Sequence, residues 1–276
     1  MSNKHCPDLD YLKFRRYEPA LPLSRYIDCY WFINSSCGSD AVFRELLHPD
    51  GGMGFIFNYG SALRFDKELL MNGSFLNGPY NQSMHLAMAG EINVAGIRFK
   101  PAGAHHFMVP PLNEFKNSFV SCSDVGLCNL NEYFCYENND LKRVQKIDSV
   151  MLALFNAEKQ ESPLALNALS IANQNRGMLK INKLSTLLGT NQRKLERVFK
   201  LHIGVSPGEY SRTVRVAQAR ARLKNKAYEL SDISFDLGFY DQAHFSKQFK
   251  SVVGLAPGEY RRRAQLRPVS LAVTSH

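Results

Sequence analysis

Two stretches near the end of this 276-residue chain carry polar side chains at the spacing of one exposed helix face. Arginine can donate two parallel hydrogen bonds, glutamine can donate and accept, and a glutamate carboxylate can only accept. Side chains with these abilities can distinguish base pairs, because each pair presents its own pattern of donors and acceptors in the DNA major groove. The residues concerned are Gln192, Arg193, Glu196, Arg197 and Lys200 in the first stretch and Gln242, Ala243, His244, Lys247 and Lys250 in the second.

Each stretch is predicted to be the second helix of a helix-turn-helix unit. A short first helix would end at Gly189 in one copy and at Gly238 in the other. The second helix would then begin at a capping residue, Asn191 or Asp241. The apolar positions that would bury the inner faces of these helices are Leu195, Val198 and Phe199 in the first copy and Phe245 and Phe249 in the second.

The two units are copies of one sequence pattern. Residues 188–212 and 237–262 share Phe-Lys, a glycine and Pro-Gly-Glu-Tyr at a constant offset of 50 residues, whereas the glycines before the turns differ by 49. One copy therefore has one extra residue in its turn. Because the shared residues frame different outward residues, we expect the two units to read two different half-sites.

A linking helix is expected between the two copies, with an apolar stripe on one side and basic residues on another. The stripe would consist of Tyr210, Val214, Ala217 and Ala221, and the basic face would carry Arg212, Arg215, Arg222 and Lys226.

The positive charge of the chain is concentrated in this region. Residues 178–276 hold 18 Lys and Arg against 7 Asp and Glu, a net charge of +11 in a chain whose total is +9. A basic region beside a near-neutral one favours a polyanionic partner, and double-stranded DNA fits the repeated helix faces. The alternative is that these charges only solvate the helices, with Glu196 bound to Lys200 one turn away.

The first part of the chain is predicted to be rich in β-strands. Residues 26–33, 53–59 and 92–99 are short runs of aromatic and β-branched residues, and residues 49–52 form a Pro-Asp-Gly-Gly turn. Several short strands with such punctuation favour a barrel or a sandwich.

Two helices are expected between these parts, because apolar residues recur at helical spacing from Leu141 to Phe155 and Ser162-Pro163 is a typical helix start. These helices favour packing within the chain, with formation of a homodimer as the alternative. The predicted fold class is α+β with two domains: a β-rich barrel- or sandwich-like regulatory domain at residues 1–138, a short helical linker at 139–177, an all-α double helix-turn-helix domain at 178–265 and a flexible tail at 266–276.

The β-rich domain could enclose a site for a small-molecule effector, because such folds contain apolar pockets with a few polar groups. The candidate lining residues are Trp31, Phe55, Phe57, Tyr59 and Arg98. The alternative for each aromatic residue is an ordinary place in the core. Arg98, in an otherwise apolar strand, needs a partner, which is either a buried carboxylate or an anionic ligand.

The six cysteines form no Cys-x-x-Cys pair and are expected to be free thiols, although Cys122, Cys128 and Cys135 could sense redox state or metal. We expect no enzymatic activity, cofactor or bound metal, because the candidate ligands do not have the spacing of a metal site. Those candidates are His48, His85, His105 and His106. No apolar run is long enough for a membrane helix, so a cytoplasmic protein without membrane contact is expected.

The segment from about Ile181 to Arg263 resembles the DNA-binding domain of AraC/XylS-type transcription regulators. The matching patterns are Leu195-x-Arg197-x-Phe199-Lys200, Gly204-Val205-Ser206-Pro207-x-x-Tyr210, Ile233-x-x-x-Leu237-Gly238-Phe239, Phe245-Ser246-x-x-Phe249-Lys250 and Gly254-x-x-Pro257-x-x-Tyr260-Arg261. The first half also resembles an uncharacterised β-rich domain found ahead of this unit, through Tyr30-Trp31, Pro49-Asp50-Gly51, Gly78-Pro79 and residues 96–103.

The resemblance implies seven helices, with two recognition helices in successive major grooves on one face of the DNA. It places Gln192, Arg193, Glu196 and Arg197 at base-reading positions of the first helix, and Gln242, Ala243, His244 and Lys247 at those of the second. Ala243 departs from a polar reader and could only contact an apolar group such as a thymine methyl. The family also implies transcription activation through contact with RNA polymerase. The alternatives are a ligand-independent regulator whose first domain only dimerises, and a β-barrel metal enzyme fused to a DNA-binding domain.

Overall fold

The computed structural model describes residues 12–36, 42–127, 130–134, 139–225 and 227–266. The predicted tail from residue 267 onward lies outside the described residues, as do Cys6, Cys37, Cys128, Cys135 and Lys226.

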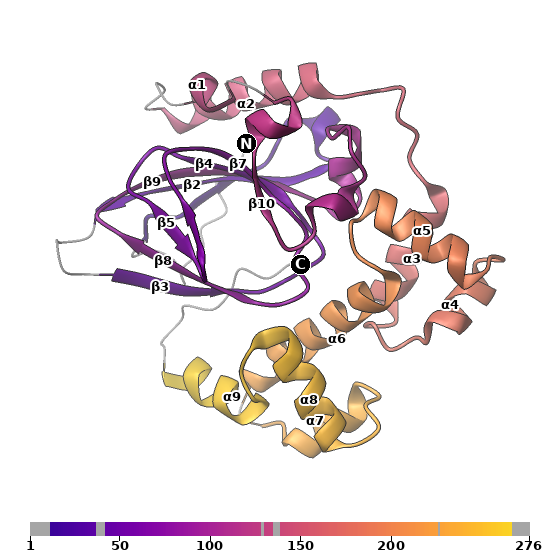
Figure 1. The fold of residues 1–276 in the computed structure, drawn as a ribbon. Coiled ribbons are helices and arrows are strands. Elements are labelled where there is room, and N and C mark those ends of the chain that lie inside the picture. The colour runs from indigo at the N-terminus through magenta and orange to yellow at the C-terminus, as the bar shows by residue number, and fades with distance from the viewer. Residues whose placement is uncertain (1–11, 37–41, 128–129, 135–138, 226, 267–276) are drawn as a thin grey trace.

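The first part of the chain folds into two antiparallel sheets (Figure 1). The six-stranded sheet contains, in spatial order, β1 (Arg15–Tyr17), β2 (Ile27–Ser36), β9 (Glu91–Phe99), β4 (Gly54–Asn58), β7 (Gly73–Asn77) and β10 (Phe119–Ser121). The four-stranded sheet contains β3 (Val42–Leu47), β8 (Met84–Ala89), β5 (Leu63–Phe65) and β6 (Glu68–Leu70).

The central strand β4 is buried along its whole length because both of its faces are covered. Successive side chains of a strand point to opposite faces. Ile56 therefore packs between the sheets with Phe65, whereas Phe55 and Phe57 pack on the outer face of the six-stranded sheet. The predicted strands at 26–33, 53–59 and 92–99 correspond to β2, β4 and β9, and the predicted β-rich sandwich is confirmed.

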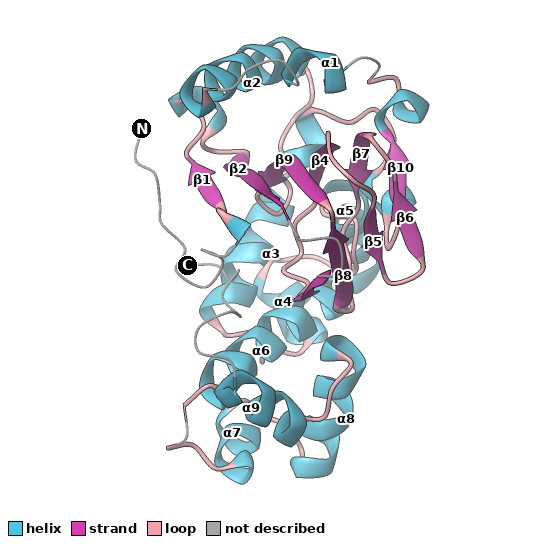
Figure 2. Cartoon of the chain, turned by 90° about the vertical axis from the view of Figure 1, so that its left-hand side faces the viewer, coloured by secondary structure: helices cyan, strands magenta, loops and turns pink. Residues whose placement is uncertain are grey.

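Helix α2 (Asp140–Leu154) covers that outer face, above the sheet in Figures 1 and 2. Its buried stripe is Val144, Ile147 and Met151, which join the core around Phe55. The stripe predicted for this helix thus packs within the chain except at its first residue, Leu141, which is exposed. The remaining elements of this part are α1 (Leu130–Phe134) and the 3-10 helices η2 (Leu21–Leu23), η3 (Gly103–His106), η4 (Leu112–Phe115) and η5 (Cys122–Val125).

The second part of the described chain is entirely helical and has two separate cores. One core joins α3 (Pro163–Gln174), α4 (Ile181–Leu187) and α5 (Gln192–His202), and the other joins α7 (Leu230–Asp236), α8 (Gln242–Val253) and α9 (Pro257–Leu266). Helix α6 (Pro207–Leu223) contributes to both. We call these assemblies the first unit (α3–α5 with the start of α6) and the second unit (α7–α9 with the end of α6). None of the described helices combines the length and apolar character needed to cross a membrane.

Candidate nucleic-acid interface

The two predicted recognition helices, α5 and α8, begin in the same way. The side-chain oxygen of Asn191 accepts a 2.8 Å hydrogen bond from the Lys194 amide, and that of Asp241 accepts a 2.6 Å bond from the His244 amide. Each cap satisfies one of the backbone N–H groups that a helix start leaves free. The remaining N–H groups at these two ends can receive phosphate oxygens.

The turns that precede these helices are also built alike. Gly189 and Gly238 have φ of +60° and +64°, a left-handed conformation that glycine adopts without a steric penalty. In the first unit the Thr190 amide donates to the Ser185 carbonyl at 3.0 Å, and in the second the Phe239 amide donates to the Ser234 carbonyl at 3.0 Å. The two copies therefore present α5 and α8 from matching turns.

Buried apolar residues fix which face of each helix is open. Leu195 and Phe199 are fully buried under α5, as are Phe245 and Phe249 under α8. Nine of the ten predicted interface residues are exposed on the other face: Gln192, Arg193, Glu196, Arg197, Lys200, Gln242, Ala243, Lys247 and Lys250. The structure thus brings each predicted set onto one open helix surface.

His244 is the tenth predicted residue, and it is partly buried because its ring packs within the turn. Its Nδ1 accepts a 3.3 Å hydrogen bond from the Tyr240 amide, and its Nε2 lies 2.7 Å from the amide nitrogen of Gln248. The ring also meets Phe239 edge-on, with 5.8 Å between centroids. Both ring nitrogens of His244 are therefore engaged within the second unit.

Glu196 and Lys200 make no ion pair in the described part of the chain, although they are one turn apart. The Glu196 carboxylate is consequently directed to solvent, as are the basic groups of Arg193 and Arg197.

Helix α6 joins the units through arginines as well as apolar residues. The Arg215 guanidinium donates 2.8 and 3.2 Å hydrogen bonds to the Gly177 carbonyl and lies 5.2 Å from the Phe239 ring. Arg220 is 3% exposed and donates to the Tyr260 hydroxyl at 3.3 Å. Of the apolar stripe predicted for this helix, Tyr210 is buried but Ala221 is exposed, so the prediction was wrong at Ala221. The helix buries several faces because it packs against two cores at once.

The β-rich domain contacts both units: in Figure 1 the first unit lies beside the sheets and the second unit lies below them. Against the first unit, Gly204 at the end of α5 lies so close to Pro79 that an added Cβ would be 2.5 Å from its ring. Glu209 in the first turn of α6 accepts hydrogen bonds from Lys116 at 2.6 Å and from Asn81 at 3.0 Å. Burial would raise the pKa of the Glu209 carboxyl, but these bonds and those within the Ser206 cap lower the pKa to about 2.

Against the second unit, the Ser83 amide donates a 2.6 Å hydrogen bond to the carbonyl of Val252, in the last turn of α8. The His48 ring meets the Tyr260 ring edge-on, with 5.8 Å between centroids. Burial, together with nearby Arg220 and Lys224, lowers the pKa of His48 to about 2, so this imidazole is neutral.

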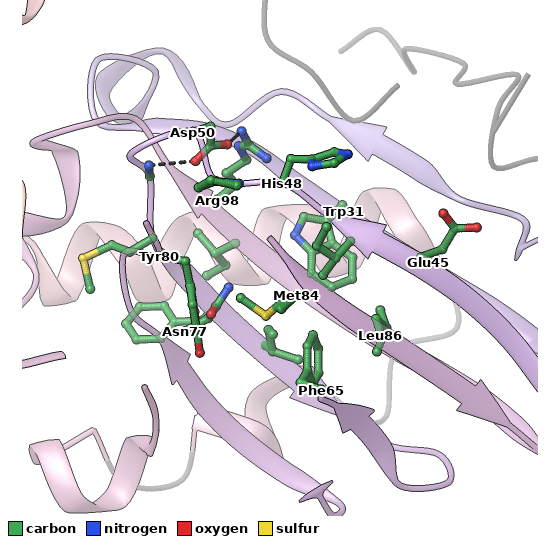
Figure 3. A pocket seen from close by; sticks show the side chains of 18 of the residues that line it. Trp31, Glu45, His48, Asp50, Phe65, Asn77, Tyr80, Met84, Leu86 and Arg98 are labelled. Carbon is green, nitrogen blue, oxygen red and sulfur yellow. Dashed lines mark hydrogen bonds and ion pairs between the residues drawn. The ribbon is translucent and has the colours of Figure 1, made fainter. Parts of the chain in front are cut away.

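A cavity of about 220 Å³ lies between the two sheets (Figure 3). Trp31 and Arg98, predicted as pocket residues, line it. Phe55 also borders the cavity although it belongs to the core beneath α2, whereas Phe57 and Tyr59 pack with that core and do not line the cavity. Arg98 forms an ion pair with Asp50, drawn as neighbours in Figure 3, and a longer one of 3.6 Å with Asp28. Of the two partners expected for Arg98, the structure therefore contains the carboxylate.

The candidate cysteines and histidines do not gather at one metal-binding site in the part of the chain that the structure describes. Cys122 is buried, and burial raises the pKa of its thiol to about 12, so the reactive thiolate is scarce. Cys128 and Cys135 are outside the described residues. His85 is exposed on β8, His105 and His106 are in η3, and no group of three metal-ligating side chains occurs among the residues the structure describes.

Comparison with known proteins agrees with this division of the chain. Residues 184–263 match the family model described as "Helix-turn-helix domain", and residues 15–121 match "Domain of unknown function (DUF6597)". An uncharacterized HTH-type transcriptional regulator of Haemophilus influenzae is 31% identical over 88 residues, which are 32% of this chain and 30% of that protein. The HTH-type transcriptional regulator GbdR of Pseudomonas aeruginosa is 30% identical over 67 residues, covering 24% of this chain and 18% of that one.

The chain spans less than a third of the length of these two curated relatives. Among solved structures, a transcriptional regulator of Chromobacterium violaceum, described as containing an AraC-type DNA-binding domain, is 27% identical. The match covers 37% of this chain and 92% of that one, with a TM-score of 0.34. Residues 184–263 therefore match a helix-turn-helix domain, and in the same chain residues 15–121, ahead of it, match a domain of unknown function.

Proposed function

We propose that the protein is a sequence-specific DNA-binding transcription regulator that reads two successive major grooves with helices α5 and α8. The observation that carries the proposal is the repeated geometry of these helices: each is capped, follows a left-handed glycine turn and exposes polar side chains opposite buried aromatic residues. A helix of this kind fits the major groove, where side chains meet base edges. The net charge of +11 over residues 178–276 favours a polyanion.

The exposed side chains divide by chemistry. Arg193 and Arg197 suit bidentate contacts to guanine, Gln192 and Gln242 suit adenine, and Glu196 suits the amino group of cytosine. Lys200 and Lys250, near the ends of their helices, suit phosphates, which position the protein without reading sequence. Since Arg193 and Glu196 in α5 correspond to Ala243 and Ser246 in α8, the two half-sites should differ and give the bound DNA a direction.

The test is binding to a DNA site identified by genome-wide mapping and footprinting. Arg193→Ala and Lys247→Ala should each weaken binding, Arg193→Ala by about 1 to 3 kcal/mol with relaxed specificity at one base pair. Arg262→Ala is the matched control, because Arg262 is also an exposed cation of the helical part but lies outside α5 and α8. If both recognition-helix variants bound the site like the parent at physiological salt, the assignment of α5 and α8 would be wrong.

The wider role is part of the same proposal. We infer a cytoplasmic regulator that activates transcription by contact with RNA polymerase and is modulated by a small molecule through its first domain. Contact of the β-rich domain with both units supports modulation. Transcription from a mapped promoter, compared between a strain with the protein and one without it, separates activation from repression.

A further inference from the structure

The inter-sheet cavity is apolar inside and polar at one end. Its lining includes Trp31, Ile56, Phe65 and Leu86, which come from both sheets. In Figure 3 the labelled polar side chains of Asp50, Arg98 and His48 gather at the top of the cavity, near the loop that precedes β4. An apolar cavity of about 150 Å³ holds benzene. The larger volume of about 220 Å³ therefore has room for a small bicyclic molecule.

The charged groups at the polar end neutralise one another. Arg98 is paired with Asp50, and Arg16 donates to Asp28 at 2.9 Å. The Glu45 carboxylate points away from Leu86 in Figure 3. An anion or a cation entering the cavity would have to break one of these pairs and would lose its own hydration, which is costly in an apolar site. The cavity consequently favours an uncharged molecule.

Two buried polar atoms of lining residues have no hydrogen-bond partner within the described residues: Asn77 Oδ1 and His48 Nε2. An amide oxygen can only accept, so Asn77 calls for an N–H or O–H donor. In Figure 3 the amide of Asn77 points toward Met84, into the group of apolar side chains. A buried acceptor without a partner is costly, and a ligand that donates to it recovers that cost.

Two loops close the polar end, and each of them contacts both parts of the helical domain. In residues 48–53, Gly51 lies against the Tyr210 ring, where an added Cβ would be 2.6 Å away, and His48 meets Tyr260. In residues 78–83, Asn81 donates to Glu209 and the Ser83 amide donates to Val252.

The loops are also tied to each other, because His48 Nδ1 lies 2.7 Å from Ser83 Oγ. Residues of both loops line the cavity, including Pro49, Asp50 and Tyr80. A molecule in the cavity would therefore touch the same segments that hold the two helix-turn-helix units.

We infer that the cavity binds a small, uncharged, mostly apolar molecule that donates a hydrogen bond to Asn77. We infer further that residues 48–53 and 78–83 relay its presence to both helix-turn-helix units. The relay rests on the proposed DNA-binding function, whereas the binding of the molecule does not. Thermodynamic reciprocity then requires DNA to change the affinity of the molecule by the same factor.

The first experiment tests the ligand class on the full chain by calorimetric titration. The probes are indole, which is uncharged and has an N–H donor, indene, which has the same shape without the donor, and benzoate, which is an anion. Indole should bind roughly tenfold more tightly than indene, and benzoate should not bind. Asn77→Leu removes the acceptor at similar size and should reduce the affinity for indole to that for indene. Equal binding of indole and indene to the parent, no binding of indole, or tight binding of benzoate would overturn the ligand class.

The second experiment tests the relay with a matched pair from the repeat. Gly204 and Gly254 end α5 and α8 with φ of +87° and +80°, so alanine is strained in both, but only Gly204 faces Pro79. Saturating indole should change the affinity for a mapped DNA site by at least about fivefold in the parent and in Gly254→Ala. In Gly204→Ala the change should be lost, while calorimetry still shows indole bound.

The results of these experiments distinguish failure of the relay from failure of the proposed DNA-binding function. A parent protein that binds DNA equally with and without indole, or a Gly254→Ala variant that loses the effect as fully as Gly204→Ala, would overturn the relay. A parent protein that binds indole but no DNA site at all would instead refute the proposed function and leave the cavity assignment standing.

Discussion

The carboxylate of Glu209 accepts a 2.6 Å hydrogen bond from the ammonium group of Lys116, which joins the helical domain to the β-rich domain. Its counterpart in the second copy, Glu259, instead pairs with Arg263 at 2.7 Å within its own helix. The same position of the repeated sequence therefore holds two domains together in one copy and stabilises a local turn in the other.

Glu209→Gln should weaken the contact between the domains. Glutamine has a single acceptor oxygen and no charge, so when that oxygen serves the helix cap its NH2 group faces Lys116 and cannot accept from it. A partly buried hydrogen bond to a charged group is worth about 1 to 2 kcal/mol. The free energy of unfolding in urea measures this loss. Glu259→Gln is the control and should cost less than about 0.5 kcal/mol, because its pair is exposed. Equal losses in the two variants would contradict the role given to Glu209.

Acid should loosen the same interface through His105 and His202, whose rings lie 4.1 Å apart between centroids. Burial, with His202, Lys159 and His106 nearby, lowers the pKa of His105 to about 4. Burial, with His106 and Lys159, also lowers the pKa of His202. The unfolded chain, with ordinary pKa values near 6.5, takes up protons first as the pH falls, so stability should be lost between about pH 6.5 and pH 4.

Thermal unfolding across this pH range checks the prediction. The double variant His105→Gln, His202→Gln should show a smaller loss of Tm than the parent. His85→Gln, an exposed position on β8, should behave like the parent. If the Tm of the parent rose on acidification, His105 and His202 could not be the cause of the pH dependence.

Arg215→Met should separate the two helix-turn-helix units while keeping the bulk of the side chain. It removes both hydrogen bonds to the Gly177 carbonyl and the contact with Phe239, at a cost of about 1 to 2 kcal/mol. Affinity for a full DNA site should fall more than affinity for either half-site alone, because the units would no longer be held at a fixed spacing. Arg212→Met, an exposed residue of the same helix, is the control.

Tyr240 is 91% exposed in the turn directly before the Asp241 cap, and it occupies the region where the second copy has its extra residue. We expect its hydroxyl to bind a DNA phosphate beside α8. Tyr240→Phe should reduce DNA affinity about fivefold, the worth of one hydrogen bond, without a change in Tm. Replacement of the exposed Tyr228 by Phe should leave affinity unchanged. An unchanged affinity of Tyr240→Phe would remove the hydroxyl from the interface.

The sequence was sufficient for features that depend on local pattern. Apolar periodicity, capping residues and turn glycines lie within a few residues of each other, so α5 and α8 begin at the predicted caps, after Asn191 and Asp241. Runs of aromatic and β-branched residues bounded by turn residues likewise predicted strands β2, β4 and β9.

Features that depend on distant contacts were missed for a physical reason. Ala221 looks apolar in a helical stripe, but α6 packs against two cores, so Arg220 is buried instead through its bond to Tyr260. His244 looks like a base reader, yet both of its ring nitrogens are used in the turn. Pairing of Arg98 with Asp50 depends on how strands β4 and β9 align, which no local pattern contains.

The contacts of Gly204 and the open surroundings of Gly254 have a consequence for how the duplicated segments can change over time. A larger residue at Gly204 would meet Pro79 as well as a strained backbone, whereas a larger residue at Gly254 would meet only the strained backbone. Mutational tolerance is therefore unequal. At this position the first copy must fit the β-rich domain, whereas the second has no neighbour within 4 Å to fit, so the two copies are under different constraints.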